Sequence, residues 1–101
     1  MSEAVYTQHE LKIKLEPIFI SAPIKKAILF GSYARGLQTA TSDIDIIIDS
    51  KGRVRGIDFF SILEDITVCL DKRIDLIEMY EIQKDSPIYQ AIEQEGVVLF
   101  E

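Results

Sequence analysis

Two aspartates separated by a single residue have the clearest chemical potential in this sequence. Asp43 and Asp45 stand at the start of an apolar segment that continues through Ile48. Because side chains alternate along a strand, we expect both carboxylates on one face, with Cα atoms about 6.5–7 Å apart. Carboxylates held this close repel each other, and a hard divalent cation relieves the repulsion. The pair therefore predicts a site for Mg²⁺, with Mn²⁺ as the alternative ion.

A glycine–serine turn precedes the aspartate pair. The apolar segment from Ala27 to Phe30 leads directly into Gly31 and Ser32. Glycine lets the backbone turn sharply and lets a ligand approach closely. We expect a short helical turn from Ser32 to Arg35, and free N–H groups at its start favour an anion such as phosphate. A phosphate cradle beside a carboxylate pair is typical of an enzyme that handles nucleotides.

The order of residues in these two segments resembles that of a known family. Leu-Phe-Gly-Ser-Tyr-Ala-Arg-Gly followed by Thr-Ser-Asp-Ile-Asp is similar to the signature of the DNA polymerase β-like nucleotidyltransferases. It looks most like the minimal nucleotidyltransferase (MNT) branch, which includes antitoxin partners of HEPN-domain toxins. The detailed match covers Ala27 to Ile48, and the order of expected elements extends it over most of the chain. The resemblance implies an α+β fold, a small mixed β-sheet with helices packed on it.

The resemblance also implies a third catalytic carboxylate, on a strand beside the aspartate pair. Asp75 is the candidate, because it interrupts an apolar strand expected from Arg73 to Met79. An ionised carboxylate buried in such a strand is costly unless it is paired or metal-bound. A structural ion pair with Arg35 or Arg73 is the alternative reading.

Other residues compete for these roles. Asp71 falls at a helix end, and Glu78 points to the face opposite Asp75 if the strand is regular, so both are weaker candidates. Arg35 fits a phosphate contact and a structural ion pair with Asp43 about equally well.

Nucleotidyl transfer is the activity that the resemblance implies, with AMP coming from ATP. Asp43, Asp45 and Asp75 would hold two Mg²⁺ ions and form the catalytic centre. Gly31 and Ser32 would contact the β- and γ-phosphates. Two ions about 3.5–4 Å apart stabilise the entering and leaving oxygens together.

The acceptor is expected to come from another chain. In the antitoxin-like interpretation, AMP goes to a tyrosine hydroxyl of a HEPN-domain toxin. Three alternatives stay open: nucleotidyl transfer to a small molecule such as an aminoglycoside, a catalytically silent nucleotide-binding antitoxin, and a purely structural antitoxin. A homo-oligomer also stays open.

Composition restricts these readings. The 101 residues are 48% hydrophobic and 28% charged, which is typical of one globular domain spanning residues 1–101. A net charge of −6 argues against an extended nucleic-acid interface. No apolar run reaches the ~20 residues that span a bilayer, and no signal peptide is recognisable, which favours a cytoplasmic location. Cys69 is the only cysteine, and we expect it to be buried.

Alternation, helical periodicity and caps predict the elements that carry the site. Pro17 is expected to end or kink the first helix. Phe59, Leu63, Ile66 and Leu70 predict the buried face of a later helix. The expected elements are a helix beginning at Thr7, strands Lys25–Phe30 and Ile44–Ile48, a helix Ile57–Leu70, a strand Arg73–Met79, a helix from Ser86–Pro87 to Glu95, and a last strand Val97–Phe100.

Overall fold

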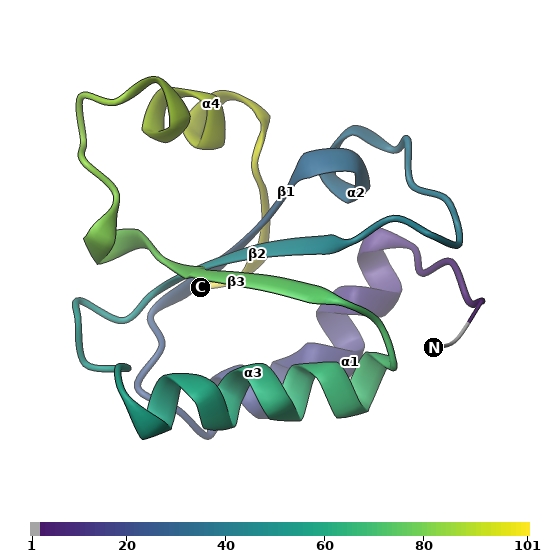
Figure 1. Cartoon of the computed structure of the whole chain (residues 1–101), viewed down its shortest axis with the longest axis horizontal. Helices are drawn as coiled ribbons and strands as arrows, with labels where there is room; N and C mark the ends of the chain where they lie inside the picture. Colours follow the sequence, from purple (N-terminus) through teal and green to yellow (C-terminus); the bar gives the residue numbers. More distant parts are fainter. Residues whose placement is uncertain (1–2) are drawn as a thin grey trace.

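The computed structural model describes residues 3–101 as four strands, four α-helices and one 3₁₀ helix (Figure 1). In chain order the elements are α1 (Gln8–Ile20), β1 (Lys26–Phe30), α2 (Gly31–Arg35), β2 (Ile44–Asp49), α3 (Ile57–Leu70), β3 (Ile74–Glu78), η1 (Met79–Glu81), α4 (Pro87–Glu95) and β4 (Val97–Phe100). Each predicted strand and helix is present, with bounds within one or two residues of those expected.

The four strands form one mixed sheet in the order β3-β2-β1-β4. β1 pairs antiparallel with both β2 and β4, whereas β2 and β3 run parallel. Parallel neighbours need a crossover connection, and α3 supplies it between β2 and β3. The predicted fold class, a small mixed sheet with helices packed on it, is confirmed.

Helices cover both faces of the sheet (Figure 1). α1 and α3 lie on one face and enclose the main core, which includes Ile44, Ile46 and Ile48 of β2. On the other face, Ile92 of α4 packs against Ile28 and Ile47 in a smaller cluster. β2 is therefore apolar along the whole face that meets the main core, and on the other face Ile47 is the apolar residue between Asp45 and Asp49.

Side-chain caps fix the starts of two helices. Thr7 and Glu10 form a capping box at α1, and Ser86 caps α4 ahead of Pro87. Of the two expected effects of Pro17, an end or a kink, the end is excluded, because α1 continues through Pro17 to Ile20. Pro17 lies on the exposed side of α1, where water can satisfy the carbonyl that loses its intrahelical partner.

α3 has the predicted bounds, but its buried face is rotated slightly from the expected one. Ile62, Ile66 and Leu70 are buried, while Phe59 and Leu63 pack at the margin of the core. Cys69 is exposed, which contradicts the expected burial, because it falls outside this stripe. No helix within residues 3–101 combines the length and apolarity that a membrane span requires.

Candidate active site

Asp45 and Asp75 lie side by side on neighbouring parallel strands. The β2–β3 register pairs Asp45 with Asp75, so both side chains leave the sheet on the same face. Asp43 precedes Asp45 by two residues, directly before β2 begins. The fold therefore gathers the three predicted site carboxylates at one end of the sheet.

This carboxylate face lies opposite the main core. Asp43 and Asp45 are half-buried, but Asp75 is exposed. The expectation that Asp75 is buried in an apolar strand is wrong, because β3 is an edge strand and the face that carries Asp75 is uncovered there. Exposure leaves Asp75 accessible to an incoming molecule.

Crowding of the acids is visible in the titration of Asp45. Partial burial, a hydrogen bond with Asp75 and the charges of Asp75 and Asp43 together raise the pKa of Asp45 to about 6, while Arg35 opposes the rise. A proton on Asp45 thus relieves repulsion that a cation could also relieve.

Replacement of Asp45 by asparagine is expected to stabilise the fold at neutral pH. Because the pKa of Asp45 is higher in the folded state than in the unfolded state, the protonated form of Asp45 favours folding. This contribution to the free energy of unfolding is fully present below pH about 4 and is lost as the pH rises through about 6. After a discount for solvent screening, Asp45→Asn should gain about 1 kcal/mol at pH 7.5, or a melting temperature about 5 °C higher. Thermal melting at pH 7.5 and pH 4 measures this, and an equal gain at both pH values would contradict it.

Gly31 brings the backbone into contact with the carboxylates. Its φ of +71° turns the chain sharply between β1 and α2. Phe30 is in register with Asp45, so Gly31 lies next to that carboxylate. A Cβ at Gly31 would overlap Oδ2 of Asp45 and lie 3.2 Å from its Cγ. Any residue other than glycine at position 31 would therefore displace the Asp45 carboxylate.

Ser32 follows at the start of α2 with its side chain half-buried. Phe30 is the N-cap of α2 and provides no side-chain cap, so Ser32 does not act as the helix cap. Among residues 3–101 its hydroxyl makes no hydrogen bond, which leaves this donor available. Gly36 ends α2 in the left-handed conformation, with φ of +73°.

Tyr33 and Gln8 hold α2 in place. Tyr33 is completely buried in the main core, and it anchors the short helix from within. Gln8 donates from Nε2 to the carbonyl oxygens of Tyr33 and Ala34, at 3.1 and 3.2 Å. No local pattern in the sequence points to Gln8, because this contact joins residues 25 positions apart.

Arg35 is exposed at the end of α2. No ion pair involves it within the described chain, so the predicted alternative of a structural pair with Asp43 is absent here. Its charge nonetheless acts on Asp45, since it opposes the rise of that pKa. Arg35 therefore stays near enough to contribute positive charge to an anionic ligand.

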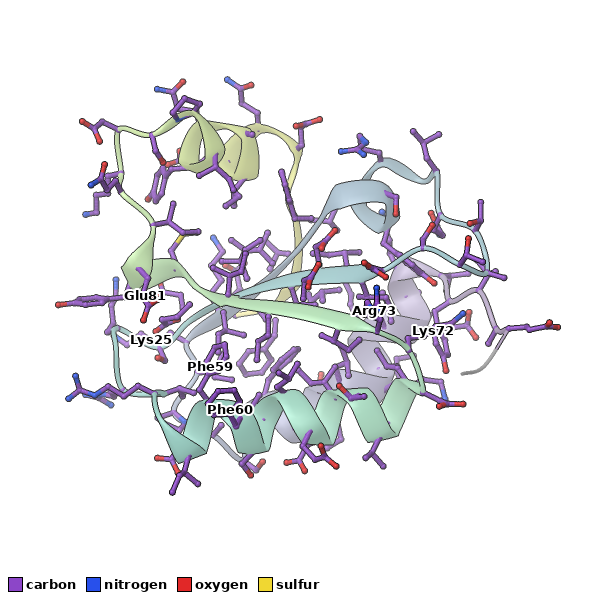
Figure 2. All side chains as sticks on the ribbon, viewed as in Figure 1. Lys25, Phe59, Phe60, Lys72, Arg73 and Glu81 are labelled. Atoms are coloured by element: carbon purple, nitrogen blue, oxygen red, sulfur yellow. The ribbon has the colours of Figure 1, made fainter. Side chains whose placement is uncertain are left out.

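Lys72 is a further site residue that sequence reasoning missed. Its side chain is only 2% exposed, and Nζ donates to the carbonyl oxygen of Ala40 at 2.8 Å. Figure 2 shows Lys72 and Arg73 where β3 begins. A cavity of about 340 Å³ adjoins Lys72 and Asp43. Lys72 thus ties the loop that carries Asp43 to the start of β3.

Loss of the hydrogen bond between Lys72 and Ala40 should reduce activity more than it reduces the stability of the fold. Lys72→Met keeps the length and burial of the side chain but removes the bond to Ala40, so the loop before Asp43 loosens. We expect the rate of nucleotidyl transfer to fall on the order of tenfold, and Mg²⁺ to bind more weakly in a titration of that rate. The free energy of unfolding should change by about 1 kcal/mol or less. Magnesium titration of the rate measures this.

Lys25→Met is the matched control, because Lys25 is an exposed lysine that lies at the opposite end of the sheet from Lys72 (Figure 2). Lys72→Arg, which keeps a cationic donor, should recover part of the activity. Equal activity of Lys72→Met and Lys25→Met would remove Lys72 from the site.

The donor set fits a hard divalent cation. Three carboxylates gather at one place, and the acid–acid crowding at Asp45 is of the kind that such a cation relieves. Within residues 3–101, no group of three or more acidic, His or Cys side chains is arranged so that it could hold a metal ion. Binding of an ion by Asp43, Asp45 and Asp75 would therefore require their side chains to move closer together.

Comparison with known proteins places this geometry in a family. The family model described as Polymerase beta, Nucleotidyltransferase matches residues 13–101. A Methanocaldococcus jannaschii protein named "Putative protein adenylyltransferase MJ0435" is 31% identical over 88 residues, which cover 84% of this chain and 95% of that protein. A second protein from this organism, "Putative protein adenylyltransferase MJ0604", is 34% identical over 84 residues, covering 76% and 79% of the two chains.

Solved structures agree on the fold. A chain of a toxin–antitoxin crystal structure with AMP-PNP superposes with a TM-score of 0.75 at 23% identity, covering 88% of this chain and 72% of that one. A chain from the complex of a tri-AMPylated Shewanella oneidensis HEPN toxin with its MNT antitoxin gives 0.70 at 20% identity, covering 93% and 72%.

The chain belongs to the polymerase β-type nucleotidyltransferase family, and it is a nucleotidyltransferase. The family resemblance drawn from the Gly-Ser and Asp-Ile-Asp segments is thereby confirmed. The roles of the individual site residues remain predictions.

Proposed function

We propose that this enzyme transfers AMP from ATP to a tyrosine hydroxyl of a HEPN-domain partner toxin, in a Mg²⁺-dependent reaction that makes it the antitoxin of the pair. The observation that carries the proposal is the register of Asp45 with Asp75, beside the close approach of Gly31 to Asp45. Nucleotidyl transfer needs acids and a phosphate-binding turn at one place, and this chain supplies both.

Asp43, Asp45 and Asp75 would hold the Mg²⁺ ions. Bound there, magnesium would neutralise the leaving pyrophosphate and lower the pKa of the acceptor hydroxyl. Mn²⁺ has similar preferences for oxygen ligands and could substitute.

The remaining roles belong to the chain itself. Gly31 admits the triphosphate close to the backbone, Ser32 donates its free hydroxyl to a phosphate oxygen, and Arg35 contributes positive charge. The acceptor oxygen forms a bond to the α-phosphorus, and the bond from that phosphorus to the bridging oxygen breaks. Pyrophosphate leaves with the electron pair, while the hydroxyl proton passes to the Asp75 carboxylate. Positioning and charge stabilisation account for most of the rate.

The comparisons support the acceptor class. Two relatives carry names of protein adenylyltransferases, and two structural neighbours are toxin–antitoxin complexes, one with AMP-PNP and one with a tri-AMPylated toxin. Those names describe the relatives and neighbours; for this chain they favour a protein acceptor over a small molecule such as an aminoglycoside.

Co-expression with the product of the neighbouring open reading frame tests the proposal. The pair should co-purify, and intact-mass measurement should show the partner heavier by one or more AMP groups. Substituting alanine for the modified tyrosine should remove the added mass. Absence of both a complex and an AMP adduct would reject the partner, and label transfer to a small molecule without any protein acceptor would favour the aminoglycoside-type alternative.

A further inference from the structure

The outer edge of β3 is an unpaired strand edge beside the carboxylates. Among residues 3–101, β3 is the first strand of the sheet and pairs only with β2. Ile44 N–H donates to the carbonyl oxygen of Arg73 at 3.0 Å, so the backbone of Arg73 faces β2. Because backbone groups alternate sides along a strand, the N–H and C=O of Leu76 face outward. Such an edge is a ready template for another strand.

A groove runs below this edge, between β3 and the start of α3. Its volume is about 270 Å³, and its apolar lining comes from Val54, Phe59, Phe60, Leu76 and Ile77. Figure 2 shows Phe59 and Phe60 near the start of α3, on the side toward β3. Phe60 is 67% exposed although its ring packs edge-to-face against Phe59, so most of this apolar side chain is open to a ligand in the groove.

The edge and the groove together match an extended polypeptide. Asp75 lies on the face of β3 that is opposite the main core, and Leu76, the next residue, faces the groove. A strand added to β3 would alternate in the same way. One of its side chains would stand beside Asp75, and the adjacent side chain would enter the groove.

We propose that the open edge of β3 binds the acceptor as an extended segment, which presents its hydroxyl side chain to Asp75 and places a neighbouring apolar side chain in the β3–α3 groove. This inference rests on the proposed function and specifies how that acceptor is recognised. The segment carries no acidic residue beside the hydroxyl, because three carboxylates already occupy this end of the sheet.

A second copy of this chain is a poor occupant of the same edge. Pairing two β3 strands about a two-fold axis would bring two Asp75 carboxylates together, between chains that each carry a net charge of −6. An acceptor segment with a neutral hydroxyl and basic flanks has the complementary charge.

A synthetic peptide, Lys-Lys-Thr-Val-Tyr-Val-Thr-Lys-Lys, tests the inference with ATP labelled at the α-phosphate. Wild-type protein should label the tyrosine. Phe60→Glu should raise KM for the peptide at least tenfold, because it puts a charge in the groove. Val68→Glu is the matched control, since Val68 lies on the same helix, is 71% exposed and does not line the groove. Stabilisation by MgATP, measured on both variants, checks the nucleotide site.

Two methylated peptides separate strand addition from side-chain binding alone. One carries N-methyl groups on the two valines, the other on the tyrosine and the threonines, so each blocks one edge of the added strand. One peptide should lose labelling and the other should keep it. Equal labelling of both would overturn strand addition.

The remaining outcomes distinguish the two proposals. A wild-type protein that binds no MgATP contradicts the proposed function itself. A protein that binds MgATP but labels no peptide, or labels it equally after Phe60→Glu, overturns only the acceptor groove. A dimer of wild-type chains that Phe60→Glu dissociates, measured by analytical ultracentrifugation, would instead assign the groove to a second copy.

Discussion

Substituting asparagine for both Asp43 and Asp45 is expected to reduce nucleotidyl transfer at least about 10³-fold while the protein stays folded. The change removes the two carboxylate charges that would hold the Mg²⁺ ions, and through them the triphosphate. It also removes repulsion around Asp45, so the folded state should be no less stable than the parent. Transfer of label from α-labelled ATP, with thermal melting of the same samples, measures both effects.

The control for this variant is a second double substitution of equal charge change. Asp65 and Asp85 are exposed and lie outside the carboxylate site. Asp65→Asn with Asp85→Asn should therefore transfer label at nearly the parental rate. If the Asp43 and Asp45 variant does the same, the metal assignment is wrong.

Gly31→Ala is expected to reduce transfer on the order of 100-fold and to destabilise the fold by about 1–2 kcal/mol. The added Cβ would overlap Oδ2 of Asp45, so that carboxylate has to leave its place beside Asp75. The left-handed φ of +71° adds backbone strain for any residue with a side chain. Single-turnover transfer and denaturant unfolding measure the two losses separately.

Gly36→Ala isolates the strain from the overlap. Gly36 has nearly the same φ, +73°, but nothing lies within 4 Å of a Cβ built on it. Gly36→Ala should therefore lose stability through strain alone, and only Gly31→Ala should also lose activity to the larger extent. Equal activity losses would mean that backbone strain at α2, and not the displacement of Asp45, explains the effect.

Local signals predicted the elements that carry the site. The Gly31–Ser32 turn, the pair Asp43 and Asp45 and the bounds of α3 all depend on residues close together in the chain. Spacing and alternation report such features directly. The family resemblance then added Asp75, which no local pattern could pair with Asp45.

Long-range features escaped prediction because they depend on strand order and on distant partners. The exposure of Asp75 follows from the place of β3 at the sheet edge, which the sequence does not state. Lys72 reaches Ala40 across 32 positions, and Gln8 reaches Tyr33 across 25. The burial expected for Cys69 came from the general preference of free cysteine for protein interiors, which does not take account of its place outside the buried face of α3.

The central claim is that Asp43, Asp45 and Asp75 bind a divalent cation beside the Gly31–Ser32 turn. Titration of isotope-labelled protein with Mn²⁺ and ATP tests it directly, because the paramagnetic ion broadens NMR signals of nearby residues. The broadening should centre on these three acids and on Gly31, and it should disappear after Asp43→Asn with Asp45→Asn. Broadening centred elsewhere, or unchanged in that variant, would contradict the account.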